Sequence, residues 1–250
     1  MIKDVPLGVQ SYCFRNFKNN DEVAGMVKEI GLAAIEVCAV HADFKNPSVF
    51  QGVIDSYKKK GVAILTTGVN GISGNEAEDR KMFDFLKMCG AKYMSVNFGL
   101  DNLDQALASA EKLAEEYNVH LGIHIHGGKH WLSNTPALKW LFKKTSPRIG
   151  LNLDTAWALD AGEDPVKMIQ EFKDRLYILH LKDFTFDRAR KHTDVVVGTG
   201  NIDLDAVNKA ITDIGFNGVA VIEYEGDAAN PVPALKGCTE AIVSKIPFRK

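Results

Sequence analysis

The chain has 250 residues, 46% of them hydrophobic and 25% charged, which is typical of a globular protein with a sizeable core. Its formal net charge of −2 gives no electrostatic reason to expect binding to nucleic acid or to an anionic membrane. No apolar run approaches the length of a membrane span.

Cysteine usage favours a reduced, cytoplasmic setting, unless an export leader has been removed. The four cysteines are widely spaced and include no Cys-x-x-Cys pair, so they predict neither a zinc ribbon nor a disulfide framework. The first six residues also lack the apolar region of a signal peptide. The composition is compatible with a homo-oligomer.

Strand and helix patterns alternate along the whole chain. Short apolar runs predict strands over Leu7–Cys13, Ala33–Cys38, Val62–Gly68, Lys92–Asn97, His120–His126, Ile149–Asp154, Leu176–Asp183 and Gly218–Glu225. Helical spacing, often closed by a glycine, predicts helices over Asp21–Ile30, Asn46–Lys60, Asn75–Cys89, Leu103–Tyr117, Thr135–Lys144, Asp164–Asp174, Leu204–Ile214 and Pro233–Ser244. A longer loop is expected after the seventh strand.

Eight such units of about 30 residues, without a low-complexity linker, predict one α/β domain over residues 1–250, a (β/α)₈ TIM barrel with an eight-stranded parallel core. A doubly wound open sheet also alternates in this way. It is the weaker choice because no Gly-x-Gly-x-x-Gly follows the first strand.

Ionisable residues interrupt the apolar strands near their carboxyl ends, where TIM barrels place their active sites. They are Glu36, His124, His126, Asp154, His180, Lys182, Glu223 and Glu225. An unpaired charge in such a strand is costly, so these residues need partners or a function.

Four of these residues, on the last four strands, are expected to converge. His124, Asp154, His180 and Glu223 would supply two imidazoles and two carboxylates, a ligand set suited to Zn²⁺, Mn²⁺, Fe²⁺ or Co²⁺. The alternative is a buried network of ion pairs and hydrogen bonds without a metal. Four potential ligands on adjacent strands favour one divalent metal ion.

The order and spacing of the late-strand motifs resemble the sugar isomerase/epimerase superfamily of xylose isomerase-like TIM barrels, which includes endonuclease IV-type DNA repair enzymes. The matching segments are His124-Ile-His126-Gly127, Leu151-Asn-Leu-Asp154-Thr155, His180-Leu-Lys182-Asp183, Gly198-Thr-Gly200-Asn-Ile-Asp203 and Ile222-Glu223. The resemblance implies that His124, Asp154, His180 and Glu223 bind the metal and that His126 lies beside the substrate.

Two positions depart from the pattern of this superfamily. His124 stands where the usual ligand is a glutamate, and a metal-bound imidazole is a poor second base, which argues against symmetric two-glutamate epimerisation. Trp157 stands where the DNA repair branch has a further histidine. Together with the negative net charge, this residue argues against DNA cleavage.

The resemblance implies an enzyme of carbohydrate metabolism whose substrate is a sugar, a keto-sugar or a sugar phosphate. The common step would be proton abstraction next to a carbonyl, giving a metal-stabilised enediolate. Glu223 is the expected base, and His126 or Lys182 would donate or relay the proton. Glu36 would orient a hydroxyl group, or form a purely structural ion pair with Lys182.

Aromatic and glycine residues suggest substrate contacts. Trp131 and Trp157, expected on loops, could stack on a sugar ring, whereas Trp140 has the spacing of a core residue. Gly198 and Gly200 could present backbone N–H groups to a phosphate, helped by Arg188, Lys191 or His192, although such glycines are at least as often turn formers.

Isomerisation or epimerisation is the leading expectation. The same enediolate can expel a β-leaving group, so a lyase or dehydratase acting on a keto-sugar or keto-inositol is the alternative. A non-catalytic carbohydrate-binding barrel is the expectation from a different class of protein.

Overall fold

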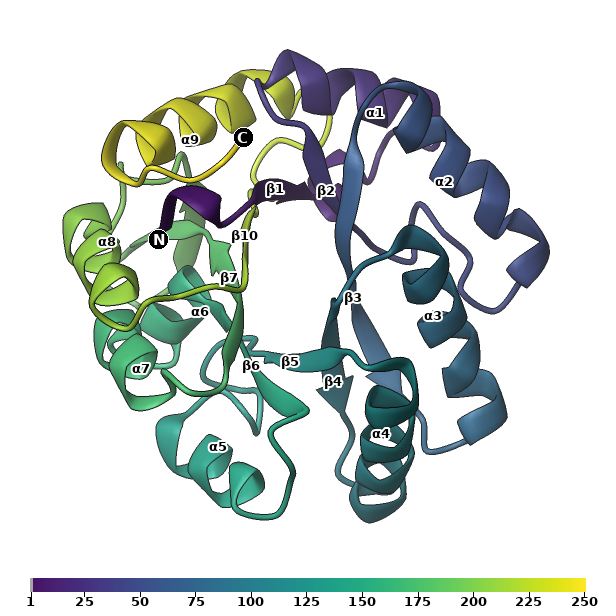
Figure 1. Cartoon of the computed structure of the whole chain (residues 1–250). Coiled ribbons are helices and arrows are strands. Elements are labelled where there is room, and N and C mark those ends of the chain that lie inside the picture. Colours follow the sequence, from purple (N-terminus) through teal and green to yellow (C-terminus); the bar gives the residue numbers. More distant parts are fainter. Residues whose placement is uncertain (1) are drawn as a thin grey trace.

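The computed structural model describes residues 2–250 and has the predicted closed barrel of parallel strands surrounded by helices (Figure 1). The barrel strands are β1 (Leu7–Gln10), β2 (Ala34–Val37), β3 (Ala63–Ile72), β4 (Tyr93–Phe98), β5 (His120–His124), β6 (Ile149–Asp154), β7 (Leu176–Leu181) and β10 (Val219–Ile222). They pair in chain order, and β10 closes the barrel against β1. Val9 of β1 lies opposite both Ile222 and Ile35, so the first strand joins the two ends of the sheet.

The helices form the outer layer seen in Figure 1. They are α1 (Asn20–Glu29), α2 (Phe50–Lys59), α3 (Glu76–Cys89), α4 (Leu103–Tyr117), α5 (Thr135–Phe142), α6 (Thr155–Asp160), α7 (Pro165–Glu171), α8 (Leu204–Asp213) and α9 (Val232–Lys245), with 3₁₀ turns η1 (Ile2–Asp4), η2 (Ser11–Phe14) and η3 (Pro47–Val49). Side chains of Asn or Asp cap several of them, including Asn75 on α3 and Asp203 on α8. Each accepts a hydrogen bond from a first-turn N–H group, which fixes where the helix starts.

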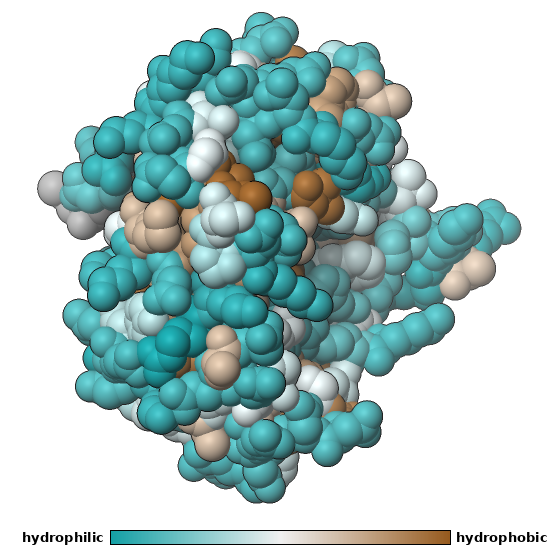
Figure 2. Space-filling view, turned by 90° about the vertical axis from the view of Figure 1, so that its right-hand side faces the viewer, coloured by the Kyte–Doolittle hydropathy of each residue, from teal (hydrophilic) through white to brown (hydrophobic). Residues whose placement is uncertain are grey.

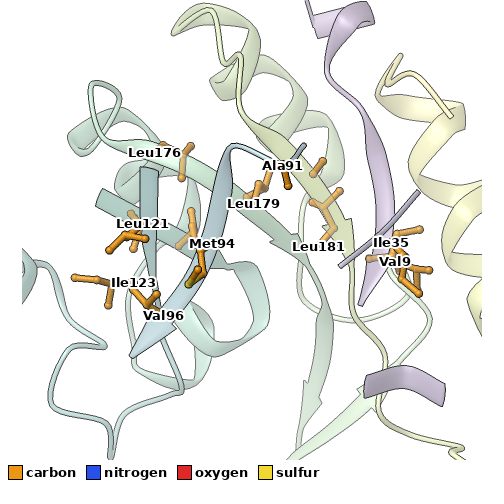
Figure 3. Packing of buried hydrophobic residues seen from close by; sticks show 14 of the residues in the cluster. Val9, Ile35, Ala91, Met94, Val96, Leu121, Ile123, Leu176, Leu179 and Leu181 are labelled. Carbon is orange, nitrogen blue, oxygen red and sulfur yellow. The ribbon is translucent and has the colours of Figure 1, made fainter. Parts of the chain in front are cut away.

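Alternate residues of the strands divide the interior into two cores. The large core lies between strands and helices and includes Val9, Ile35, Ile123 and Leu181 (Figure 3). A small separate cluster of Ile178, Val219 and Val221 is formed by residues of β7 and β10. Residues two apart on a strand point to the same face, so His180 of β7 shares the barrel interior with Ile178 and there contacts Asn152 of β6.

The connection after β6 differs from the prediction. Helix α6 begins at Thr155, directly after β6, because the Oδ1 atom of Asp154 accepts a hydrogen bond from the N–H group of Trp157 and caps the helix. Trp157 therefore lies on a helix and not on a loop.

The connection after β7 also differs. Strand β7 ends at Leu181, and an antiparallel hairpin of β8 (Asp183–Phe186) and β9 (His192–Val195) follows where a longer loop was expected. A two-stranded hairpin gives a weaker sequence signal than a barrel strand, since neither of its strands is buried on both faces.

The expectation that Trp140 lies in the core is wrong. Its side chain is 45% exposed, and the Lys144 ammonium group lies 4.5 Å from the ring centre. The helical position of Trp140 therefore faces outward, while its neighbour Leu141 is buried.

The outer surface is mostly hydrophilic on the side shown in Figure 2, with hydrophobic residues in small separate patches. Within residues 2–250, no helix is long and apolar enough to cross a membrane. All four cysteines carry free thiols, and three of them are buried.

Candidate metal centre and active site

Four buried residues meet at the carboxyl ends of four neighbouring strands. His124 and Asp154 are the last residues of β5 and β6, His180 is the next-to-last residue of β7, and Glu223 directly follows β10. One ligand atom from each residue can be chosen so that all four lie within 4.8 Å of one another. The structure thus brings together the four residues that the sequence singled out as ligands.

The distances define a compact cluster of nitrogen and oxygen atoms. The Nδ1 atom of His180 lies 3.0 Å from Oε2 of Glu223 and 3.1 Å from Nε2 of His124. The same Nε2 atom lies 3.7 Å from Oε2 of Glu223 and 3.8 Å from Oδ2 of Asp154. Two nitrogens and two carboxylate oxygens around one point are the donors that a transition-metal dication or zinc prefers.

Asp154 supplies an independent indication of a missing partner. Its side chain is fully buried, and its Oδ2 atom has no hydrogen-bond partner among the described residues. Oδ1 is satisfied by the helix α6 N–H group, so the free oxygen is the one that faces the cluster. Buried polar atoms are rarely left unpaired, and the donor set therefore fits a cation at this point.

The pKa values of the cluster reflect burial and the opposite charges of neighbouring groups. Burial raises the pKa of Asp154 to about 8 and lowers that of His124 to about 4. Burial also opposes charge on His180, but the carboxylates of Glu36 and Glu223 raise its pKa to about 10. The pKa of Glu223 is held well below its usual value, because the nearby Lys182 and histidines outweigh its burial. Without a metal, the cluster therefore relies on protons and on Lys182 to balance its carboxylates.

Glu36 contacts the metal cluster through His180 and is not among the residues that line the cavity next to the cluster. It is fully buried, and its Oε1 atom lies 3.2 Å from Nε2 of His180 and 2.5 Å from Nε2 of Gln10. The expected alternatives, a hydroxyl contact or an ion pair with Lys182, are both replaced by this pairing with His180. A carboxylate on the far nitrogen of a ligand histidine fixes the ring and its tautomer.

His126 lies beside the cluster and not within it. Its Nδ1 atom is 3.1 Å from Nδ1 of His124. The side chain of His126 is exposed and lines the cavity next to the cluster. The two histidines of this motif therefore differ in position. One joins the buried ligand set, and the other faces the space that a substrate would enter.

Lys182 is a buried cation held by two carboxylates. Its side chain is fully buried, it forms a hydrogen-bonded ion pair with Glu225, and its ammonium group lies 3.9 Å from Asp194. Burial opposes its charge, but the carboxylates of Glu223, Asp154, Glu225 and Asp194 together raise the pKa of Lys182 above its usual value. Lys182 therefore remains a cation, and it contacts the cavity wall through Glu225 and through the ring of Trp157, whose centre lies 5.3 Å from its ammonium group.

A cavity of about 380 Å³ opens above the cluster. Its lining residues are Gln10, Tyr12, Cys38, Ala39, Val40, Gly68, Val69, His126, Trp157, Glu223 and Glu225. Glu223 is the member of the described metal cluster that also lines this cavity. A metal ion bound by Glu223 would thus lie next to a molecule in the cavity.

Of the two tryptophans predicted to contact a substrate, Trp157 lines the cavity and Trp131 does not. Trp157 lines the cavity and lies edge-on to Phe184, with the two ring centres 5.0 Å apart. Trp131 does not line it, because its indole N–H group donates to the carbonyl of Phe98 and its ring lies edge-on to Trp140.

The glycines expected to bind a phosphate have another partner. The N–H groups of Gly198 and Gly200 both donate to Oδ2 of Asp183, at 2.9 and 2.8 Å, and those of Asn201 and Ile202 donate to its Oδ1. A buried carboxylate of the chain thus occupies the position proposed for a substrate phosphate. The structure contradicts the predicted substrate contact of both glycines.

The residues expected to help them are engaged elsewhere or exposed. His192 stacks on Phe184, with ring centres 4.4 Å apart, and contacts Asp160. Arg188 and Lys191 are exposed, and neither lines the cavity among the described residues.

Several residues around the site were not singled out from the sequence. Gln10, at the end of β1, is 1% exposed and binds Glu36, and the same late-strand rule that found Glu36 would have found it. Tyr12 lies in the 3₁₀ turn η2 directly after β1, and Asp194 lies in β9, where a loop was expected, so neither carried a comparable signal.

Comparison with known proteins gives the same architecture. The family model described as xylose isomerase-like TIM barrel matches residues 24–241. Among solved structures, 3-keto-D-glucoside 4-epimerase YcjR from E. coli aligns with a TM-score of 0.73 at 15% identity, covering 96% of this chain and 100% of that one. The IOLI protein, solved with a zinc atom, aligns with a TM-score of 0.75 at 16% identity, covering 96% and 98%.

A curated relative is named inosose dehydratase, from Lacticaseibacillus casei, and is 25% identical over 191 residues. The match covers 69% of this chain and 61% of the relative, so it spans about three fifths of that protein's length. This relative is named as a dehydratase and YcjR as an epimerase, which agrees with the expectation of an enzyme family. With the closed barrel and a family match over most of its length, the chain belongs to the xylose isomerase-like TIM barrel family.

Proposed function

We propose that the protein is a divalent-metal-dependent isomerase or epimerase that removes a proton next to the carbonyl of a keto-sugar. The observation that carries this proposal is the buried cluster of His124, Asp154, His180 and Glu223 at the floor of the cavity. Two neutral imidazoles and two carboxylates would leave a bound dication without excess charge, which suits a site buried in protein.

The unpaired Oδ2 atom of Asp154 supports the metal assignment. A divalent ion bound there would polarise a substrate carbonyl and offset the negative charge that develops during proton removal. Zn²⁺, Mn²⁺, Co²⁺ and Fe²⁺ all accept this ligand set, and the zinc in the related IOLI fold is consistent with it.

Glu223 is the proposed base. It lines the cavity, and the nearby Lys182 and histidines keep its pKa well below its usual value, so that it is ionised and able to accept a proton. Nε2 of His180 is paired with Glu36, and its Nδ1 lies 3.0 Å from Oε2 of Glu223, so both of these atoms would face a bound metal and leave the other oxygen of Glu223 to accept the proton. The base therefore has a set orientation toward the cavity.

His126 is the proposed proton donor. When His124 uses Nε2 toward the metal cluster, its Nδ1 carries the hydrogen and donates to Nδ1 of His126. His126 then keeps its own hydrogen on Nε2, and its exposed ring borders the cavity. This arrangement presents an N–H group to a substrate oxygen.

Lys182 is proposed to act through Glu225. The ion pair fixes the Glu225 carboxylate at the cavity wall, where it can accept hydrogen bonds from sugar hydroxyl groups. The positive charge of Lys182 also favours the negatively charged enediolate over the neutral ketone.

A dehydratase acting by β-elimination is the second candidate. Only one carboxylate of the metal cluster lines the cavity, and a single base with His126 as acid suits removal of a proton and a hydroxyl group better than exchange between two faces. The curated relative named inosose dehydratase supports the same alternative. A non-catalytic carbohydrate-binding barrel is the third, less favoured because all four ligand positions hold competent donors.

Deuterium exchange tests these alternatives. Metal-loaded protein would be incubated in D₂O with keto-sugars and keto-inositols and followed by NMR. Deuterium next to the carbonyl, with all hydroxyl groups kept, supports isomerisation or epimerisation, and loss of water supports the dehydratase. No exchange with any of these substrates at full metal occupancy would rule out both enzymes.

A matched pair of variants assigns the base. Glu223→Gln is expected to abolish exchange while the barrel stays folded, whereas the exposed Glu29→Gln on α1 should leave it unchanged. Full exchange in Glu223→Gln would remove this residue from the mechanism.

A further inference from the structure

A second cavity adjoins the one above the metal cluster. It has a volume of about 320 Å³, and both cavities are lined by Ala39, after β2, and Val69, in β3. The second cavity extends toward the start of α3, away from the metal ligands. Together the two have the size of a pocket for a ligand larger than one sugar ring.

We propose that the natural substrate is an uncharged glycoside, whose keto-sugar ring occupies the cavity at the metal cluster and whose second ring or aglycone occupies the adjoining cavity. This inference rests on the proposed function, because it extends the substrate of that site. It excludes a sugar phosphate as the preferred substrate.

The second cavity combines apolar and polar walls as a sugar site does. Phe44 and Met82 provide apolar surface, and Phe44 is held edge-on against Phe85 with ring centres 5.2 Å apart. Asn70 lies at the wall with 4% exposure, and its amide donates a hydrogen bond of 3.3 Å to Thr67. Sugar rings present both C–H faces and hydroxyl groups, which such a wall can meet.

Part of this wall is held firmly in place. The carboxylate of Asp79 accepts hydrogen bonds from the N–H and hydroxyl groups of Ser73, the N–H group of Gly74 and the hydroxyl group of Ser109. A preformed wall reduces the ordering that a bound ligand must cause, so the cavity is suited to binding as it stands.

The charge of the lining opposes a phosphate. Asp43, Glu78 and Asp79 all line the second cavity, whereas Lys45 is the single cation among its described lining residues. Glu78 is paired with Lys81, at 2.8 Å, which still leaves carboxylates in excess. A phosphate group carries about −1.5 to −2 charges at neutral pH and would be repelled here, whereas hydroxyl groups donate readily to carboxylates.

The loop after β9 provides an independent observation against a phosphate. The backbone N–H groups of Gly198 and Gly200, which a phosphate would need, already donate to the buried carboxylate of Asp183. The other cavity adds Glu223 and Glu225 and has no Lys or Arg among its described lining residues. The second cavity and the glycine loop therefore offer a phosphate group no favourable position.

The wild-type protein tests the inference by binding alone. Metal-loaded protein would be titrated with an unreactive glucose disaccharide, with glucose and with glucose 6-phosphate, by calorimetry. We expect the disaccharide to bind at least about tenfold more tightly than glucose, which corresponds to about 1.4 kcal/mol, because its second ring adds contacts in the second cavity. Equal affinity of the disaccharide and glucose, or tightest binding of the phosphate, would overturn the inference.

A substitution in the second cavity localises the effect. Gly71 lines that cavity but not the first, and a Cβ placed on it meets no atom within 4 Å. Gly71→Phe should lower the preference for disaccharide over glucose by about tenfold. Gly52→Phe on exposed α2, where a Cβ also meets nothing within 4 Å, is the matched control and should keep the preference. An unchanged preference in a folded Gly71→Phe protein would place the second ring elsewhere and overturn the assignment.

Turnover separates this inference from the proposed function. Deuterium exchange would be measured with a 3-keto-glucoside, the free 3-keto-sugar and its 6-phosphate. A kcat/KM highest for the glycoside supports both proposals, and a free sugar or phosphate that exchanges best supports the function but overturns the glycoside. If no ketone exchanges, the function fails, and the binding preference alone decides whether the second cavity holds a sugar ring.

Discussion

The Oε1 atom of Glu36 lies 3.2 Å from Nε2 of His180, although the two residues stand on β2 and β7, which are not neighbours in the barrel. The contact therefore crosses the barrel interior beneath the metal cluster. It leaves Nδ1 as the histidine atom that faces Glu223. The orientation of one ligand is thus set by a strand that contributes no ligand.

Glu36→Gln is expected to weaken metal binding by about tenfold to a hundredfold, because the ligand ring loses the carboxylate that fixes its tautomer. Metal affinity would be measured by competition with a chelator of known strength. The exposed Glu29→Gln serves as the control. Equal metal affinity in Glu36→Gln and the wild type would show that the contact does not support the ligand.

Adding a divalent ion is expected to stabilise the fold. Metal at a hundred times its Kd should add about 2.7 kcal/mol to the free energy of unfolding, since the ion binds a site that exists only in the folded chain. Thermal unfolding with and without Mn²⁺, Zn²⁺ or Co²⁺ measures this gain.

The gain should disappear in His180→Ala, which removes a ligand, and persist in His120→Ala, whose histidine packs against Tyr177 at the start of β5. The same gain in His180→Ala as in the wild type would place the ion outside the proposed cluster.

Asp183→Asn is expected to destabilise the protein by about 2–3 kcal/mol. The carboxylate accepts four backbone hydrogen bonds, two at each oxygen, and an amide keeps only one of these oxygens. Urea unfolding followed by circular dichroism would measure the loss.

Asp187→Asn is the matched control, because Asp187 accepts two backbone hydrogen bonds in an exposed turn. Its cost should stay below about 1 kcal/mol. Similar losses in the two variants would mean that the glycine loop does not depend on the buried anchor.

Lys182 and Glu225 are expected to be energetically coupled. Lys182→Met should cost about 3–5 kcal/mol, because it leaves Glu225 and Asp194 without their buried cation. In a double-mutant cycle with Glu225→Gln, the double variant should be more stable than additivity predicts by about 0.5–3 kcal/mol.

The exposed pair of Lys209 and Asp213 on α8 provides the comparison, with an expected coupling of about 0.3–0.5 kcal/mol. Additive losses at Lys182 and Glu225 would contradict the view that the lysine acts through its carboxylate partner.

The barrel and its ligand cluster could be predicted because they depend on local patterns. Each strand is marked by a short apolar run, and each ligand interrupts such a run at the end that faces the active site. The predicted helix Leu103–Tyr117 agrees with α4 at both ends, since apolar spacing defines its buried face. The convergence of His124, Asp154, His180 and Glu223 then follows from the geometry of a closed barrel.

Two of the errors concern contacts that the local sequence does not reveal. The motif of Gly198 and Gly200 looks the same whether its N–H groups meet a phosphate or Asp183, and only the folded chain shows which. The outward direction of Trp140 likewise depends on how α5 is rotated against the barrel, since both of its helical faces carry apolar residues.

Lys182 and Asp183 are neighbours, yet the first holds Glu225 and the second holds the loop of Gly198 and Gly200. These two neighbouring residues therefore hold both Glu225 and the loop of Gly198 and Gly200 to the end of β7, the strand that supplies His180. These contacts fix the rim beside β7, whereas at Gly71, on the opposite half of the rim, a Cβ would meet no atom within 4 Å. Redesign of substrate preference should begin on that opposite half, where a changed side chain need not disturb the metal ligands.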